Sequence, residues 1–458
     1  MGERASLRAR AAARAGVMRL RPRLRLPGHR GTTAHLCSLY PFSVQPSFGW
    51  RGAYIGLDLL AGGAEFCWDP FEAYQAGQIT NPNCWVLGEP GNGKSALVKT
   101  LLWRMAGIWG TGTGGRWMAI ADPKGEYVGL ADALGLTVVR LTPGGTTRLN
   151  PLATGPDVGE CAEKQVLRRA EMVAALLATV LERPLTQVED VAVFGAVESL
   201  VDASASARWR SGDATLADLA HVLTDLPDDI RLRLHRDGRD PSDELGAVRY
   251  GMDKLLCRSL RGMFDGPSTV DVDWSGAGLV LDLSAVPLDS EALPLVMVAA
   301  AGWLSQLMAA PGPQRVQVLD EAWALLGNRH TAAYLQTCFK LGRTYGVSNI
   351  CIAHRPSDLG AQADDGTATA KIAAGLLADS ATKIVLRQAP DQIEAASRSF
   401  GLTDPEEQVV AQLARGRALW KVGGRTAVVH HVMTAREAAM CDTDSRMVGS
   451  PAPIAEAA

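Results

Sequence analysis

The chain alternates between short apolar runs and longer segments with helical spacing. The runs are bounded by glycine or polar residues and fall at residues 83–87, 117–121, 137–141, 278–283, 316–319, 348–353 and 418–422. Short runs that are apolar throughout are typical of strands buried on both faces of a parallel sheet. The pattern therefore predicts an α/β fold with a mostly parallel sheet.

Two regions depart from this pattern. Residues 50–75 hold two short alternating runs around Gly62-Gly63, which predict a β-hairpin. Residues 155–266 have apolar positions at helical spacing, which predict an all-α insertion. We therefore divide the chain into a basic leader predicted to be disordered (1–48), a small β element (49–82), the first part of the core (83–154), the α-helical insertion (155–266), the second part of the core (267–445) and a disordered tail (446–458).

Composition excludes several classes of protein. With 47% hydrophobic and 21% charged residues the chain is globular, and a net charge of −3 gives no overall signature of polyanion binding. None of the eight cysteines has metal-ligand spacing, which favours reduced thiols and a cytoplasmic location. Residues 292–310 are apolar but contain Pro294, Ser305 and Gln306, so a buried helix is favoured over a membrane span.

The first thirty residues are strongly basic. Residues 1–30 hold nine arginines and one acid, Glu3. Such a segment is either an arm that touches anionic lipid or nucleic acid, or a disordered leader. The second reading is favoured, and the first stays open.

The first core strand leads into a Gly-rich segment. It reads Gly88-Glu89-Pro90-Gly91-Asn92-Gly93-Lys94-Ser95, followed by Ala96 and a helical stretch. This spacing fits the phosphate-binding P-loop, in which backbone N–H groups and a helix N-terminus surround phosphates. Lys94 would neutralise the phosphates and Ser95 would bind Mg²⁺. A chance Gly-rich turn is the alternative, but the strand and helix around the segment favour nucleotide binding.

Further polar residues follow three other predicted strands. Asp320 and Glu321 follow the apolar run at 316–319, within a strand predicted to extend over 316–323; Asp320 would hold Mg²⁺ and Glu321 would polarise the attacking water. A charged cluster, Asp122-Pro123-Lys124-Gly125-Glu126-Tyr127, follows the run at 117–121, where ligands bind in open α/β sheets; ordinary turn chemistry is the alternative. His354 follows the run at 348–353 and either contacts the γ-phosphate or is structural.

These motifs make the chain resemble a known family. Together with Asn150-Pro151-Leu152, Gly342-Arg343-Thr344-Tyr345-Gly346 and Cys441-Asp442-Thr443-Asp444, they are similar to those of the ATPase of type IV secretion and conjugation systems, the fourth VirB component. That family belongs to the FtsK/HerA class of P-loop motors. The resemblance covers roughly residues 50–445 and implies a RecA-like P-loop NTPase fold. Two features differ: the family's Thr-Gln at the sensor position is Ala353-His354 here, and only residues 1–87 precede the P-loop.

The resemblance also implies an activity and partners. It implies ATP hydrolysis with Mg²⁺ in a homo-hexamer at the cytoplasmic face of the cell membrane, in contact with secretion-channel and coupling proteins and with DNA as an open candidate. It further implies an arginine that acts on the neighbouring subunit. Arg343 is the first choice because Gly342 and Gly346 flank it; the others are Arg415, Arg387 and Arg355.

Two other functions remain open at this stage. A TraG-type coupling protein or FtsK/HerA-like DNA translocase fits the segment at 122–126 equally well, although coupling proteins usually begin with membrane spans. A nucleotide-binding ring scaffold that does not hydrolyse ATP is the alternative from another class. The presence of Glu321 argues against the scaffold.

Overall fold

The computed structural model describes residues 46–153, 162–205, 213–234, 244–270, 272–273, 275–308, 312–326, 329–354 and 368–442. Residues 1–45 of the predicted leader and the whole predicted tail, 446–458, lie outside these ranges. From Pro46 onward the chain forms one compact unit. The segment boundaries predicted above remain predictions.

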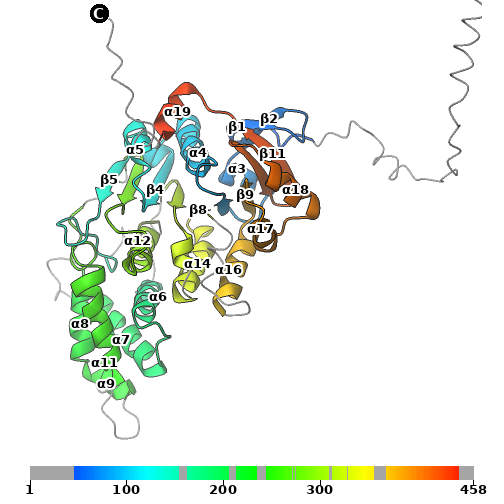
Figure 1. The fold of residues 1–458 in the computed structure, drawn as a ribbon. Coiled ribbons are helices and arrows are strands. Elements are labelled where there is room, and N and C mark those ends of the chain that lie inside the picture. Colours follow the sequence, from blue (N-terminus) through cyan, green and yellow to red (C-terminus); the bar gives the residue numbers. More distant parts are fainter. Residues whose placement is uncertain are drawn as a thin grey trace, which may run out of the picture. The chain divides into compact units, whose positions relative to one another are not determined.

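One sheet organises the described residues (Figure 1). Its eleven strands lie in the order β2-β1-β11-β10-β9-β3-β8-β7-β4-β6-β5. The strands are β1 (Ala53–Asp58), β2 (Ala64–Trp68), β3 (Cys84–Leu87), β4 (Arg116–Asp122), β5 (Thr137–Arg140), β6 (Gly278–Asp282), β7 (Gln314–Leu319), β8 (Val347–Ala353), β9 (Thr382–Leu386), β10 (Arg417–Val422) and β11 (Arg425–His431).

The sheet is mostly parallel, as predicted. The seven strands from β9 to β5 pair in parallel, whereas β10, β11, β1 and β2 pair antiparallel at one edge. The predicted hairpin forms from β1 and β2. It is not separate from the core, because β1 pairs with β11 and so extends the same sheet.

Helices cover both faces of the sheet because its central strands are apolar on both sides. In β3, Cys84 and Val86 face one core while Trp85 and Leu87 face the other. The first core lies under α3 (Pro70–Gln75), α4 (Lys94–Trp109) and α5 (Val128–Leu134). The second lies under α12 (Ala292–Met308), α14 (Arg329–Gly342) and α16 (Ala368–Asp379), on the opposite side in Figure 1.

The predicted insertion is helical where the structure describes it. Its helices pack on one another and on α12 and α14, and Figure 1 shows most of them, in green, away from the sheet. They are α6 (Ala162–Val180), α7 (Gln187–Ala205), α8 (Leu216–Thr224), α9 (Asp228–Leu234), α11 (Gly246–Lys254) and a π-helical turn, Leu255–Ser259. The remaining helices are a 3₁₀ turn (Gly112–Gly114), α13 (Trp323–Leu326), α17 (Ile393–Phe400), α18 (Asp404–Gln412) and α19 (Ala435–Cys441).

The apolar helix α12 is buried, as the sequence predicts. Its residues from Leu295 to Ala301 are at most 3% exposed and lie in the second core. No helix among the described residues has both the length and the apolar character that a membrane span requires. This face of the sheet therefore carries two helical layers, α12 and α14 below it and α6 packed on both of them.

Candidate functional site

The Gly-rich loop connects the end of β3 to the start of α4. Gly91 and Gly93 have φ angles of 79° and 98°. These angles lie in the left-handed region, which glycine adopts at little cost. The turn lets α4 begin directly at Lys94, so the positive end of its dipole faces the loop. This is the geometry of an anion site at a helix N-terminus.

Neighbouring strand ends hold the loop in place. Gly88 N–H donates to the last carbonyl of β8 at 3.3 Å. The side chain of Asn92 donates to the carbonyl of Arg387 at 3.4 Å, and the carboxylate of Glu89 accepts from the N–H of Ala389 at 3.1 Å. Three residues predicted to bind the cofactor therefore use a backbone N–H or a side chain to fix the loop: Gly88, Glu89 and Asn92.

A cavity of about 670 Å³ opens beside the loop. This volume suits a nucleotide-sized ligand. The turn after β4, the end of β8 and the segment around α19 supply the rest of its lining. The predicted cofactor-binding residues that line it are Pro90, Gly91, Gly93, Lys94, Ser95 and Ala96.

Lys94 is a buried cation in this cavity. Its residue is 4% exposed. Burial and the nearby ammonium of Lys124 lower the pKa of Lys94 to about 8, although the charges of Asp320, Glu321 and Glu126 oppose this. A polyanion such as a nucleotide phosphate would stabilise both ammonium groups.

Asp320 and Glu321 directly follow β7, as predicted, and each is 2% exposed. Burial and the charge of Glu321 raise the pKa of Asp320 to about 7. Glu321 has a φ of 53°, a left-handed conformation that costs a non-glycine residue about 1–2 kcal/mol. Strain of this kind is concentrated at functional sites.

Glu321, which follows β7, is contacted by Lys124 from the turn after β4 and by His354 from the end of β8. Its Oε1 lies 2.5 Å from Nε2 of His354 and forms an ion pair with Nζ of Lys124. The Lys124 and His354 nitrogens are themselves 2.7 Å apart. Burial would raise the pKa of Glu321, but hydrogen bonds to and charges on His354 and Lys124 lower it to about 2. Glu321 is therefore ionised, but it is a weak base while both contacts persist, because a general base works best with a pKa near the operating pH.

A buried aspartate builds the turn that presents Lys124. The carboxylate of Asp122 accepts backbone N–H groups from Lys124, Gly125, Glu126 and Tyr127 at 2.8 to 3.2 Å. The sequence offered two interpretations of this segment, a ligand site and an ordinary turn, and both are partly right. Asp122 forms the turn, and the turn places Lys124 and Glu126 in the cavity lining. Sequence analysis located the segment but assigned no role to Lys124. A lysine directly after a core strand was the available signal.

The residues predicted to hold Mg²⁺ fit that ion. Ser95 lines the cavity in the first turn of α4, and the charge of Asp320 acts on the adjacent Lys94. Hydroxyl and carboxylate oxygens are ligands that Mg²⁺ accepts alongside phosphate and water. Burial and the charge of Glu321 outweigh the opposing charge of Lys124 at Asp320, so a bound cation would stabilise the ionised form of this carboxylate. No group of three or more His, Cys, Asp or Glu residues that could hold a metal by itself occurs in the described part of the chain.

The four candidate arginines lie in different places. Arg343 is exposed in the turn before β8, whereas His354 follows the end of β8. The cavity lies at the C-terminal end of β8 and Arg343 precedes its N-terminal end. The seven residues of the strand therefore separate Arg343 from the cavity by about 23 Å. It could act only on another chain, and that role stays a prediction. Arg415 lines the cavity of its own chain, Arg387 lies beside the P-loop, and Arg355 lies outside the described residues.

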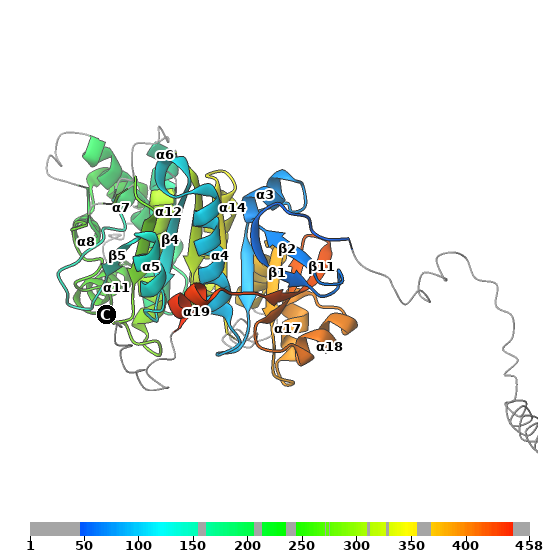
Figure 2. The same cartoon turned by 90° about the horizontal axis from the view of Figure 1, so that it is seen from above.

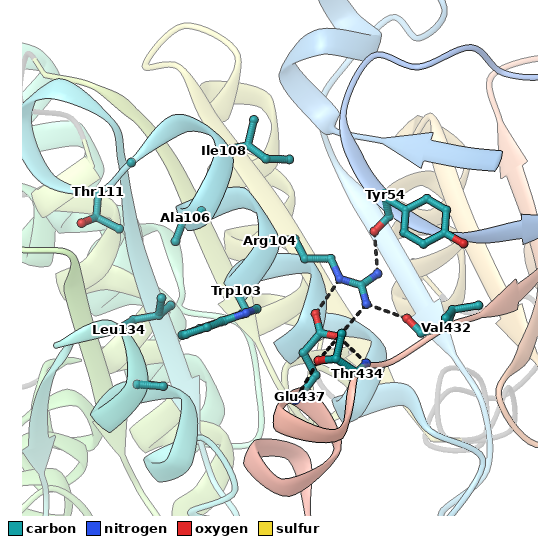
Figure 3. Close-up of a pocket in the computed structure, with 13 residues that line it drawn as sticks. Tyr54, Trp103, Arg104, Ala106, Ile108, Thr111, Leu134, Val432, Thr434 and Glu437 are labelled. Carbon is teal, nitrogen blue, oxygen red and sulfur yellow. Dashed lines mark hydrogen bonds and ion pairs between the residues drawn. The ribbon is translucent and has the colours of Figure 1, made fainter.

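One wall of the cavity is α19, which packs on α4 and α5 (Figure 2). Arg104 of α4 fixes this helix through two contacts to Glu437, at 2.6 and 2.8 Å (Figure 3). The same guanidinium donates to the carbonyls of Tyr54 and Val432, both at 2.5 Å. Glu437 also forms a capping box with Thr434. The helix that follows the P-loop therefore holds the wall of the cavity.

Arg104 and Glu437 line a second cavity, of about 580 Å³. Figure 3 shows Trp103, Ile108 and Leu134 around it. The guanidinium of Arg104 is already bonded to Glu437 and to the carbonyls of Tyr54 and Val432 (Figure 3). The cavity is mainly apolar and has no feature of a phosphate site.

Comparisons with known proteins identify the fold. The chain aligns with VirB4 of Thermoanaerobacter pseudethanolicus at a TM-score of 0.67 and 20% sequence identity, over 86% of this chain and 100% of that one. The chain has a VirB4-like fold. No protein-family model and no curated protein sequence matches it.

A second solved protein has a similar fold. The bacterial conjugative coupling protein TrwBΔN70 aligns at a TM-score of 0.53 and 16% identity, over 84% of this chain and 90% of that one. The plasmid coupling protein TrwB in complex with the non-hydrolysable ATP analogue ADPNP gives 0.53 and 16%, over 89% and 96%. The RecA-like P-loop fold implied by the sequence motifs is therefore confirmed.

Proposed function

We propose that this chain is the ATP-hydrolysing motor of a conjugative or type IV secretion apparatus. Its turnover would energise assembly of the apparatus or transfer of a DNA or protein substrate. The observation that carries the proposal is a cavity lined by Lys94, Lys124 and His354 in a VirB4-like fold. Lys124 and His354 both contact the ionised carboxylate of Glu321 directly behind this lining.

The residues have separate tasks in this reaction. Lys94 and the backbone of the P-loop bind the β- and γ-phosphates. Ser95 and Asp320 would hold Mg²⁺, which neutralises charge on those phosphates when it is bound. Glu321 accepts a proton from the water that attacks the γ-phosphorus, while the bond between that phosphorus and the bridging oxygen of ADP breaks. The products are ADP and inorganic phosphate.

TrwB structures support the choice of ligand. TrwB has been solved with ADPNP and with ADP and Mg²⁺, and this chain shares its fold. We further propose a homo-hexamer in which Arg343 completes the site of a neighbour. Such a ring would work at the cytoplasmic face of the cell membrane, in contact with secretion-channel and coupling proteins.

A coupling protein is the second candidate, because TrwB is similar over most of this chain. The two candidates differ in their response to DNA. A coupling protein that moves DNA should hydrolyse ATP faster when DNA is added, whereas an assembly motor should respond little. Phosphate release measured with and without DNA separates them.

The test of hydrolysis compares the wild type with Glu321→Gln. The amide cannot accept the proton of the water, so we expect phosphate release to fall at least about a hundredfold. ATP binding should be unchanged, because the phosphate-binding residues are intact. If the wild type binds ATP but releases no phosphate, the chain is a nucleotide-binding scaffold and the proposal is wrong.

A further inference from the structure

A second lysine shares the nucleotide cavity with the P-loop lysine. Lys124 and Lys94 both line this cavity, so two ammonium groups face the same space. Two ammonium groups that face one space repel each other unless an anion lies between them. Lys94 belongs to the P-loop motif, whereas Lys124 belongs to the motif at residues 122–127, in which the sequence assigned it no role.

The contacts of Lys124 conflict with those of its neighbour. Nε2 of His354 lies within hydrogen-bond distance of both Glu321 Oε1 and Lys124 Nζ. A ring nitrogen that donates to the carboxylate carries a proton and cannot also accept from the ammonium. Nδ1 of His354 is buried and has no hydrogen-bond partner among the described residues. One of the three contacts must therefore be weaker, and Lys124, with its flexible stem and a side chain 26% exposed, is the group free to move.

Both carboxylate oxygens of Glu321 are already engaged. Oε1 faces Lys124 and His354, and Oε2 accepts the indole N–H of Trp323. A water that is to be deprotonated needs an open acceptor site on one of these oxygens, each of which has two. Departure of Lys124 would leave His354 on Oε1 and open the second acceptor site of that oxygen, without disturbing the indole contact.

We propose that Lys124 is a γ-phosphate-binding residue that also controls the general base. On this view, which rests on the proposed function, the Lys124 side chain moves when ATP binds. Its ammonium group leaves Glu321 and pairs with an oxygen of the γ-phosphate. Glu321 Oε1 then accepts the hydrogen bond of the attacking water. After the phosphorus–oxygen bond to ADP has broken and phosphate has left, Lys124 returns to Glu321. The lysine thereby links base activation to the presence of a third phosphate.

Lys124→Met tests this, because methionine keeps the stem and removes the charge. We expect affinity for ADPNP to fall about tenfold to a hundredfold, as loss of a charged hydrogen bond implies. Affinity for ADP should change less than threefold, since ADP lacks the γ-phosphate. Binding is measured by calorimetry with Mg²⁺ present, and the rate at saturating ATP by phosphate release.

Two further variants make the result decisive. Lys124→Arg keeps the charge and should retain most of the preference for ADPNP over ADP. Lys164→Met, an exposed lysine of α6, should behave as the wild type in both assays. Thermal unfolding checks that each variant is folded; if Lys124→Met is not, loss of the preference in Lys124→Arg decides against the proposal.

The outcomes separate this inference from the proposed function. If Lys124→Met binds ADPNP and ADP as the wild type does, Lys124 does not bind the γ-phosphate and the inference is wrong, whatever the rate. If the wild type binds both nucleotides but hydrolyses nothing, the proposed function fails, and loss of the ADPNP preference still supports γ-phosphate binding. If the wild type binds neither nucleotide, both are overturned.

Discussion

Replacing Arg104 should loosen the wall of the nucleotide cavity. In Arg104→Met the carboxylate of Glu437 stays buried, with a side chain only 4% exposed, but loses both of its guanidinium contacts. Removing one partner of a buried ion pair costs about 3–5 kcal/mol. The lowered pKa of Glu437 points in the same direction. Burial would raise it, but hydrogen bonds from Arg104 and Thr434 and the charge of Arg104 lower it from 4.5 to about 2, so Arg104 accounts for only part of the shift.

The sign of the pH dependence follows from that lowered pKa. A carboxyl whose pKa is lower in the folded state stabilises the fold fully above its ordinary value of 4.5, and this contribution disappears as the pH falls towards 2. We therefore expect wild type and Arg104→Met to differ most in the free energy of unfolding near neutral pH. The difference should narrow below about pH 4.5.

Urea unfolding followed by tryptophan fluorescence measures this difference. The matched control is Arg398→Met, which breaks an exposed ion pair with Glu394 and should cost under about 0.5 kcal/mol. Nucleotide affinity should also fall in Arg104→Met, because α19 lines the cavity. If Arg104→Met is destabilised no more than the control at neutral pH, the pair does not hold α19 and the reasoning fails.

Two further predictions concern hydrolysis. His354→Ala should slow phosphate release with little change in nucleotide affinity. His354→Gln restores the residue type of the family that the chain resembles and should retain more activity than His354→Ala. Equal rates for the wild type and both variants would make His354 a structural residue. For the neighbour's arginine, inactive Lys94→Ala chains that keep Arg343 are mixed with inactive Arg343→Ala chains that keep a working P-loop. Mixed rings should regain activity that neither preparation has alone, because a trans-acting arginine contributes about a thousandfold or more to the rate; mixed rings that form but stay inactive would exclude Arg343 from that role.

Strands and loops with strong local signals were predictable from the sequence. The P-loop carries its own glycines, and β4, β6 and β8 are buried on both faces and were each placed to within one residue. The start of β7 was placed to within two residues, but the strand ends at Leu319, four residues before the predicted end at Trp323. The strand β11, which lies between β1 and β10, was not predicted, because it alternates only in part and ends in two histidines. The hairpin of β1 and β2 was predicted, but its union with the main sheet depends on pairing between residues near 57 and 430, which no local pattern encodes.

The site was predictable by its parts and not by its contacts. Lys94, Asp320, Glu321 and His354 each follow a recognisable strand, so the sequence could assign them to one edge of the sheet. The ion pair between Lys124 and Glu321 could not be read in this way. It depends on β4 lying beside β7, and strand order is a property of long-range packing. Arg104 and Glu437 are likewise 333 residues apart in the sequence.

The position of β8 between β3 and β7 gives one strand contacts with both halves of the chemistry. Its last carbonyl accepts the N–H of Gly88 in the P-loop at 3.3 Å, and the carbonyl before it accepts the N–H of Ala322, next to Glu321, at 3.0 Å. A displacement of this strand would therefore move the phosphate-binding loop and the general base together. The turn that carries Arg343 enters the same strand at its other end. If Arg343 engages a neighbouring chain, as proposed, β8 would connect that contact to the site about 23 Å away.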